Sequence, residues 1–140
     1  MILAIDVGNT NIVVGCIDDL KTYFIERLST NRTKTELEYA VDLKNVLDIY
    51  HIKKTEIEGC IISTNIVKLA AEKILKKNAI VLGPGVKTGL NIMMDNPGQL
   101  GADQVADAVA GIAGYPVPLI LIDMGTATTA SVVNSKKQYV

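Results

Sequence analysis

The chain has 140 residues, 49% of them hydrophobic, with 14 basic and 15 acidic residues and a net charge of -1. This length suits one domain or two very small ones, and the apolar content is ample for a packed core, which excludes a disordered chain. No block of Lys and Arg is long enough to mark a surface for nucleic acid or for a membrane. We therefore expect neither as a partner.

The sequence has the features of a reduced cytoplasmic protein. Cys16 and Cys60 lie inside apolar runs, where we expect buried thiols that pack as small hydrophobic groups. The N-terminal residues show no signal-peptide pattern, and no apolar run reaches the roughly 18 residues of a membrane helix.

The first third of the chain predicts a three-strand meander followed by a helix. The strands are β-branched runs at Met1 to Ile5, Ile12 to Ile17 and Thr22 to Leu28. From Thr33 to His51 the period changes to that of a helix of about four turns, and Thr33 with Glu36 has the capping-box spacing. The predicted inward residues of this helix are Leu37, Ala40, Val41, Leu47 and Tyr50.

The following segments alternate between strand and helix. We predict a strand at Cys60 to Ser63, a helix at Ile66 to Lys77 and a strand at Ala79 to Leu82. The inward residues of this second helix are predicted to be Leu69, Ala70 and Ile74. The resulting order βββαβαβ predicts an α/β fold with a mixed sheet.

Residues 83–100 are rich in Gly and Pro and predict a long loop, and loops of this length are usually functional. Within it, GPGVKTG is no P-loop, because Val86 stands where Gly must precede Lys87, and it does not fit GxGxxG. A helix from Ala102 to Ile112 follows, and new strands begin after Pro118.

One phrase occurs twice, as ILAIDVGNTNIVV at residues 2–14 and as LILIDMGTATTASVV at residues 119–133. A strand that ends in Asp and turns on Gly offers backbone N–H groups and a carboxylate, which suit phosphate oxygens and Mg²⁺. One such turn is usually a plain hairpin. Two matched copies, the second with Thr126, Thr128 and Thr129, favour a duplicated fold that binds a nucleotide between its halves.

Asp103, in the run GADQVADAVAG, is predicted to lie in the first turn of a helix. A carboxylate there is favoured by the helix dipole and by the unpaired N–H groups, so spacing alone leaves a helix cap and a catalytic carboxylate equally open. Asp107 and His51 are expected to be solvated surface groups.

Three phrases together resemble the motifs of the type III pantothenate kinases, the bacterial enzymes that begin coenzyme A synthesis. They are DVGNTNI at Asp6 to Ile12, PGQLGADQ at Pro97 to Gln104 and DMGTATT at Asp123 to Thr129. The resemblance implies the fold of the actin, sugar kinase and heat-shock ATPase superfamily, with ATP between two ribonuclease-H-like halves. We expect residues 1–115 to form the first half and 116–140 the opening strands of a second, incomplete half.

The resemblance also implies roles for individual residues. Asp6 would lie near Mg²⁺, Asp123 would bind K⁺ or NH4⁺, and Asp103 would be the general base for the pantothenate hydroxyl. The implied nucleotide-binding residues are Asp6, Val7, Gly8, Asn9, Thr10, Asn11, Ile12 and Val13, with Gly125, Thr126, Thr128 and Thr129. The implied substrate-binding residues are Met94, Gly101, Ala102, Asp103 and Gln104. The implied assembly is a homodimer.

Several residues depart from the family pattern. Gln104 stands where an Arg would pair with the pantothenate carboxylate, a loss of about 2 to 3 kcal/mol of binding. Met94 stands where a Tyr is usual, and Gln99 where an acidic residue is usual. Family members also continue beyond NSKKQYV, so a three-stranded remnant would expose an apolar face and an edge strand.

These departures leave two alternatives to a pantothenate kinase. One is a non-catalytic nucleotide-binding or regulatory relative that has lost the pantothenate site. The other is a kinase for a different small alcohol that lacks the carboxylate.

Overall fold

The computed structural model describes residues 1–83 and 85–140, which form two compact units, Met1–Leu82 and Gly83–Val140. Pro84, which belongs to the predicted loop, lies outside the described residues. The predicted boundary between residues 115 and 116 concerns the duplication of the fold and stays a prediction. Within the described ranges, none of the helices has the length and apolar character needed to cross a membrane.

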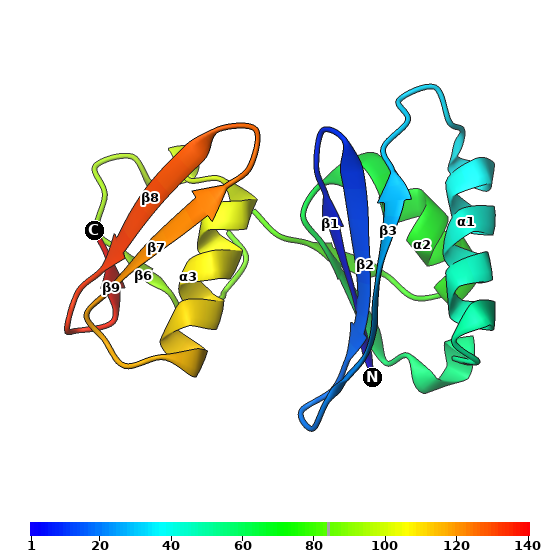
Figure 1. Ribbon diagram of the computed structural model, residues 1–140, viewed down its shortest axis with the longest axis horizontal. Coiled ribbons are helices and arrows are strands. Elements are labelled where there is room, and N and C mark those ends of the chain that lie inside the picture. The colour runs from blue at the N-terminus through cyan, green and yellow to red at the C-terminus, as the bar shows by residue number, and fades with distance from the viewer. Residues whose placement is uncertain (84) are drawn as a thin grey trace. The chain divides into compact units, whose positions relative to one another are not determined.

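Unit 1 is built on a five-stranded mixed sheet with the order β3-β2-β1-β4-β5 (Figure 1). The strands β1 (Ile2–Val7), β2 (Asn11–Ile17) and β3 (Thr22–Ser29) pair antiparallel, as short polar turns allow. The strands β4 (Gly59–Ile62) and β5 (Ala79–Val81) continue the sheet parallel to β1. The predicted meander and mixed α/β sheet are therefore confirmed.

Helices cover one face of this sheet. Figure 1 shows α1 (Glu36–Ile49) and α2 (Lys68–Leu75) on the same side of it. The short 3₁₀ helices η1 (Lys54–Glu56) and η2 (Asn65–Val67) lead into β4 and α2. Because each parallel strand must be reached by a crossover, both helices run back against the direction of β1 and β4.

The core of unit 1 lies between the sheet and these helices. Alternate residues of β1 and β2 are buried, as expected for strands with one covered face; they are Leu3, Ile5, Ile12, Val14 and Cys16. Both cysteines are free and buried, which confirms that prediction, and burial raises the pKa of the Cys60 thiol to about 12.

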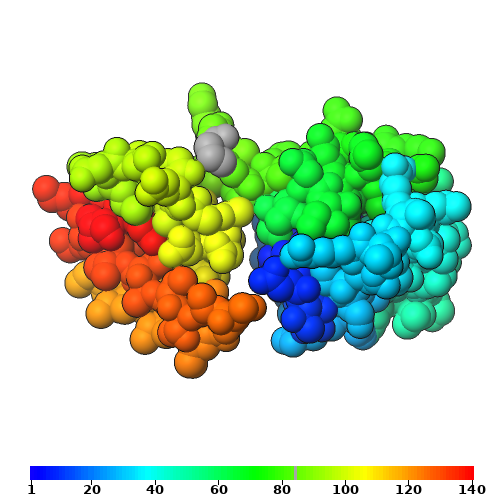
Figure 2. Space-filling view, turned by 90° about the horizontal axis from the view of Figure 1, so that it is seen from above, coloured from blue at the N-terminus to red at the C-terminus, as the bar shows by residue number. Residues whose placement is uncertain are grey.

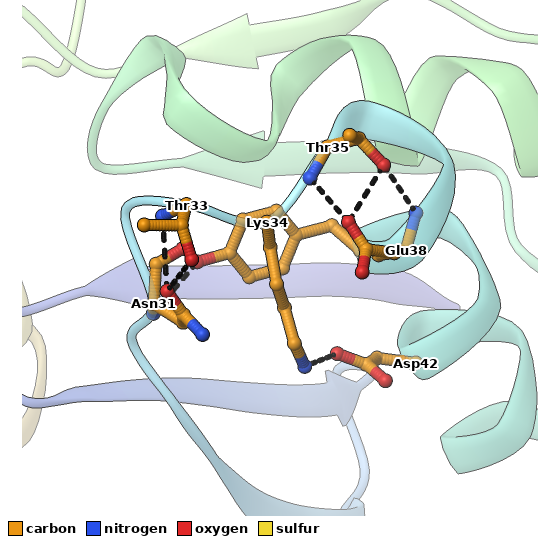
Figure 3. A network of polar contacts seen from close by, with 7 residues as sticks. Asn31, Thr33, Lys34, Thr35, Glu38 and Asp42 are labelled. Atoms are coloured by element: carbon orange, nitrogen blue, oxygen red, sulfur yellow. Dashed lines mark hydrogen bonds and ion pairs between the residues drawn. The ribbon is translucent and has the colours of Figure 1, made fainter.

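The predicted cap of α1 is wrong by two residues. The N-cap is Thr35, whose N–H donates to Glu38 Oε2 at 2.7 Å, while Glu38 N–H donates to Thr35 Oγ1 at 3.3 Å (Figure 3). The Thr35 N–H and the Thr35 hydroxyl both donate to the Glu38 carboxylate, and these two hydrogen bonds lower the pKa of Glu38. Thr33 instead bonds Asn31 Oδ1 through its hydroxyl at 2.7 Å.

The predictions of which helix residues face the core are correct only in part. In α1 the buried residues are Tyr39, Ala40, Leu43, Val46 and Leu47. The predicted Leu37 and Val41 are 62% and 48% exposed, because Tyr39 is fixed inward by two hydrogen bonds between its hydroxyl and the backbone of Asn31. Tyr50, which is 36% exposed, stacks on Phe24 with ring centroids 4.5 Å apart.

The prediction of the inward residues of α2 is also correct only in part. Ala70 is buried and Ile74 packs against the core, as predicted, whereas Leu69 is 60% exposed. The buried positions are instead completed by Ala71 and Leu75.

Unit 2 has a four-stranded sheet with the order β6-β9-β8-β7. Its long strands are β7 (Leu119–Met124) and β8 (Thr128–Val133), and β9 (Gln138–Tyr139) completes a meander. The strand β6 (Asn91–Ile92) pairs parallel to β9, and η3 (Pro97–Gln99) follows it. The prediction of an unstructured loop over residues 83–100 is therefore wrong for these two segments.

The helix α3 (Ala102–Gly114) covers one face of this second sheet. It approaches β7 closely at Gly111, where a Cβ would lie 2.9 Å from the Leu121 side chain. On the other face Ile120, Ile122 and Met124 are 69%, 64% and 81% exposed. The predicted apolar face is therefore exposed, but the sheet has four strands instead of the predicted three, and α3 covers its other face.

The corrected cap of α1 leads to the first prediction. Thr35→Ala removes the oxygen that accepts the Glu38 N–H, so it should lower the free energy of unfolding by about 1 kcal/mol. Thr33→Ala is the matched control and should cost only a few tenths of that, about 0.3 kcal/mol, because Thr33 caps no helix. Urea unfolding followed by circular dichroism measures both. A larger loss in Thr33→Ala would contradict the assignment of the cap.

Candidate functional site

The first Asp-Gly turn joins β1 to β2 at the carboxyl end of β1. Asp6 is exposed on the sheet face opposite the core, and its backbone pairs with Val13. Gly8 N–H donates to Asn11 O at 2.8 Å, and a Cβ on Gly8 would lie only 3.0 Å from that oxygen. The absence of a side chain at position 8 therefore permits the tight turn.

Two residues distant in sequence fix this turn in place. Val7 N–H donates to Ser63 Oγ at 2.8 Å, at the end of β4. Thr30 Oγ1 donates to Gly8 O at 2.8 Å, and Thr30 N–H donates to Thr10 O at 2.9 Å. Figure 2 shows the blue atoms of the turn side by side with the light-blue atoms of the segment after β3.

The turn has backbone N–H groups without a hydrogen-bond partner among the described residues. Within the described ranges, the N–H groups of Asn9 and Thr10 make no hydrogen bond, and both residues are exposed. Such successive N–H groups are suited to phosphate oxygens. Ile12 differs from its neighbours because its side chain is fully buried, so it anchors the turn in the core.

The second Asp-Gly turn joins β7 to β8 in unit 2. Asp123 pairs with Thr129, and Met124 pairs with Thr128. Gly125 N–H donates to Ala127 O at 3.2 Å, which closes a three-residue turn with Thr126 exposed at its tip.

Strand alternation separates the predicted threonines of this second turn. Asp123 and Thr129 are half-buried on the face that α3 covers, with Leu121. Thr128 is exposed on the opposite face. The structure thus brings Asp123 and Thr129 together and leaves Thr128 apart from them.

The third predicted cluster lies at the start of α3. As predicted, Asp103 occupies the first turn of the helix. Its Oδ1 accepts the N–H of Gln104 at 2.8 Å. A Cβ added to Gly101 would lie 2.3 Å from the same Oδ1, so the carboxylate holds this position only because residue 101 is glycine.

The side chain of Gln104, whose contact with substrate stays a prediction, forms a hydrogen bond within its own helix start. Its Oε1 accepts the N–H of Gly101 at 3.2 Å, which caps the start of α3. The side chain that was expected to stand in for a substrate-binding Arg is therefore engaged with the backbone of its own helix.

Unit 2 has a cavity of about 620 Å³ beside this cluster. It is lined by parts of residues 83–105, including Lys87, Gly98 and Ala102. Ala102 is the one predicted substrate residue in this lining, since Met94, Gly101, Asp103 and Gln104 are not part of it. Met94 is 37% exposed between β6 and η3.

The carboxylates of the candidate site suit a metal ion only together with the oxygen atoms of a bound phosphate. Across residues 1–83 and 85–140, no group of three or more His, Cys, Asp and Glu side chains could hold a metal ion. Mg²⁺ in phosphate sites is commonly held by one or two carboxylates together with phosphate and water oxygens. The exposed Asp6 beside the unused N–H groups of its turn fits that mode.

Sequence reasoning missed two positioning residues, Thr30 and Ser63. Ser63 had a signal, because it is the last residue of the strand predicted at Cys60 to Ser63, at the edge of the sheet where the β1 turn lies. Thr30 had none, since its contact depends on where β3 ends.

Comparison with known proteins identifies relatives across the whole chain. The family model for type III pantothenate kinase matches residues 2–140. Type III pantothenate kinases of Exiguobacterium sp. (strain ATCC BAA-1283 / AT1b), Halalkalibacterium halodurans and Geobacillus sp. (strain WCH70) are 43%, 44% and 46% identical to it over 99% of the chain. The chain spans 57%, 57% and 56% of the length of these relatives.

The contact at Gly101 leads to the second prediction. Gly101→Ala places a Cβ against the Asp103 carboxylate, so the carboxylate should rotate away and the Gln104 N–H should lose its acceptor. Amide hydrogen exchange at Gln104 should become faster by about tenfold, the equivalent of about 1.4 kcal/mol for a lost hydrogen bond to a charged group. Gly98→Ala is the control, because its nearest neighbour would be 3.8 Å away. Equal exchange in both variants would refute the proposed steric role.

Proposed function

Because the chain belongs to the type III pantothenate kinase family, we propose that it transfers the γ-phosphate of ATP to pantothenate. The product is 4'-phosphopantothenate, and the reaction opens coenzyme A biosynthesis. The chain spans just over half of the length of its relatives, 57% for the first, so the proposal concerns the part of the site that these residues carry.

The observation that supports this proposal best is the placement of Asp103. A carboxylate in the first turn of α3 accepts one N–H through Oδ1, which fixes its orientation and leaves Oδ2 for a substrate hydroxyl. In the proposed reaction the hydroxyl oxygen forms a bond to the γ-phosphorus while the bond to the bridging β–γ oxygen breaks. The hydroxyl proton passes to Asp103, and ADP leaves.

The two Asp-Gly turns support the nucleotide part of the proposal. Phosphoryl transfer depends mainly on positioning and on neutralisation of phosphate charge. The Asn9 and Thr10 N–H groups would bind phosphate, and Asp6 would hold Mg²⁺, which supplies charge neutralisation when bound. Thr126 would contact phosphate, and Asp123 would bind K⁺ or NH4⁺. From the family resemblance we also propose a cytoplasmic homodimer.

The third prediction concerns the base. Asp103→Asn should lower the rate of 4'-phosphopantothenate formation about 100-fold or more, because the amide cannot accept the proton. Its Oδ1 can still accept the Gln104 N–H, so the fold should be kept. Asp19→Asn, an exposed turn residue, is the control. Mass spectrometry of the purified chain with ATP, Mg²⁺, K⁺ and pantothenate measures the product. Product formed at equal, measurable rates in both variants would refute Asp103 as the base.

A second candidate function is a nucleotide-binding relative without kinase activity. The orientation of Gln104 favours it, because the side chain caps α3 and offers no cation to the pantothenate carboxylate. A kinase for an uncharged alcohol would fit the same observation.

The fourth prediction separates these functions. Gln104→Arg supplies the missing cation, so a pantothenate kinase should gain about 30- to 150-fold in affinity for pantothenate. Steady-state kinetics on the purified chain gives this as a fall in KM. Gln99→Arg, which adds the same charge in η3, is the control. A chain that binds ATP but forms no product in either variant would support the non-catalytic relative.

A further inference from the structure

Unit 1 contains a second cavity, of about 620 Å³, between the C-terminal part of α1, η1 and the C-terminal part of α2. This volume is within the range of small-molecule pockets. Leu47, Ile52 and Ile74 give it an apolar wall. None of the residues predicted to bind nucleotide, metal or substrate lines it.

The rim of this cavity concentrates positive charge. In a chain of net charge -1, five of the 14 basic residues line it, together with the only histidine. Asp48 is the one acidic residue in the lining. The five lysines are Lys44, Lys53, Lys54, Lys73 and Lys76.

Only two of these lysines have an acidic partner. Lys44 Nζ lies 2.7 Å from Asp48, and Lys73 Nζ lies 2.7 Å from Glu36. In the part of the chain that the structure describes, the other three form no ion pair. The cavity therefore carries about three uncompensated positive charges.

The backbone at Lys76 strengthens this observation. Lys76 ends α2 in the left-handed region, with φ of 56°. Glycine is the residue best suited to that conformation at a helix end, and a side chain there is unfavourable. A lysine at a helix C-terminus also offsets the helix dipole, so the two roles must be separated by experiment.

The cavity lies at the other end of unit 1 from the Asp6 turn. The turn follows the carboxyl end of β1, and both helices run back along the sheet to the opposite edge (Figure 1). Ligands of α/β sheets ordinarily bind at the carboxyl ends of the strands. A ligand in this cavity would therefore occupy a site separate from the proposed nucleotide site.

We propose that this cavity binds a small organic phosphate, with the phosphate on Lys53, Lys54 and Lys76 and the carbon part against Leu47, Ile52 and Ile74. Lysine binds phosphate as a compact charge that adapts to the position of the ligand. The lining has no Arg and no Phe, Tyr or Trp, the side chains on which the bases of single-stranded nucleic acid mainly stack, so a small molecule is favoured over a nucleic acid. This inference does not depend on the kinase proposal.

The test uses phenyl phosphate as the probe. It is titrated into the isotope-labelled 140-residue chain, and the amide shifts of Leu47, Ile52 and Ile74 are followed by NMR. These shifts should saturate, and inorganic phosphate should bind more weakly because it does not contact the apolar wall. Raising the salt concentration from 50 to 300 mM should weaken the binding, because the lysines are exposed.

Two matched variants separate a binding site from general surface charge. Lys76→Gly removes a cavity charge, and Lys137→Gly removes the charge of another left-handed lysine, with φ of 60°, outside the cavity. Both should keep or raise the thermal stability, because glycine suits the conformation. Only Lys76→Gly should weaken the binding of phenyl phosphate, by about three- to tenfold.

Four results would overturn the proposal. Amide shifts that do not saturate would mean that phenyl phosphate only associates with general surface charge. Equal weakening of phenyl phosphate binding in both variants would mean the same. Equal affinity for inorganic phosphate and phenyl phosphate would show that the apolar wall does not contribute to binding, and it would refute the organic part of the proposed ligand. A fall in stability of Lys76→Gly with unchanged phosphate binding would assign this lysine to the helix dipole alone.

Discussion

Backbone pairing across two hairpins is the constraint on which the rest of this structure depends. In both, the Asp lies one position before the last pair of the ladder, Asp6 opposite Val13 and Asp123 opposite Thr129. Because ladder bonds fix the strand ends, each carboxylate is held at the mouth of a turn whose closure leaves N–H groups unused. The side chains around each turn then need only hold it in place, as Ser63 does for the first.

The repeated Ile-Asp-x-Gly sequence nevertheless lies in different surroundings in the two units. In β1 the residue before Asp6 is the buried Ile5, on the face covered by α1 and α2. In β7 the corresponding Ile122 is 64% exposed, because α3 covers the other face through Leu121. Asp6 is consequently exposed and Asp123 half-buried. Two similar sequences thus give carboxylates of different solvation.

The sequence predicted those features that depend on local periodicity or on turn chemistry. The meander, both crossover helices and the helical position of Asp103 follow from alternation, a 3.6-residue period and a Gly-Ala-Asp start. The inward face of α1 could not be predicted in this way, because Tyr39 is fixed by hydrogen bonds to the backbone of Asn31. This is a tertiary contact without a sequence signal. The strand β6 was missed since its two residues are strand only through pairing with β9, nearly fifty positions later (Asn91 with Gln138). In the candidate site the predicted turns exist, but the grouping of Asp123 with Thr129 and not with Thr128 needed the register.

Residue 104 faces two competing demands that the first turn of α3 imposes. In the proposed kinase a long cation there would pair with the pantothenate carboxylate, but it cannot accept the Gly101 N–H, which would be left to solvent. Gln104 accepts that N–H at 3.2 Å, and capping interactions of this kind contribute about 0.5 to 2 kcal/mol to helix stability. The carboxylate contact that an Arg would make is worth about 2 to 3 kcal/mol, but only in the presence of the ligand. Glutamine therefore favours an ordered helix start in the free protein, where the Gln104 N–H also holds the Asp103 carboxylate in place.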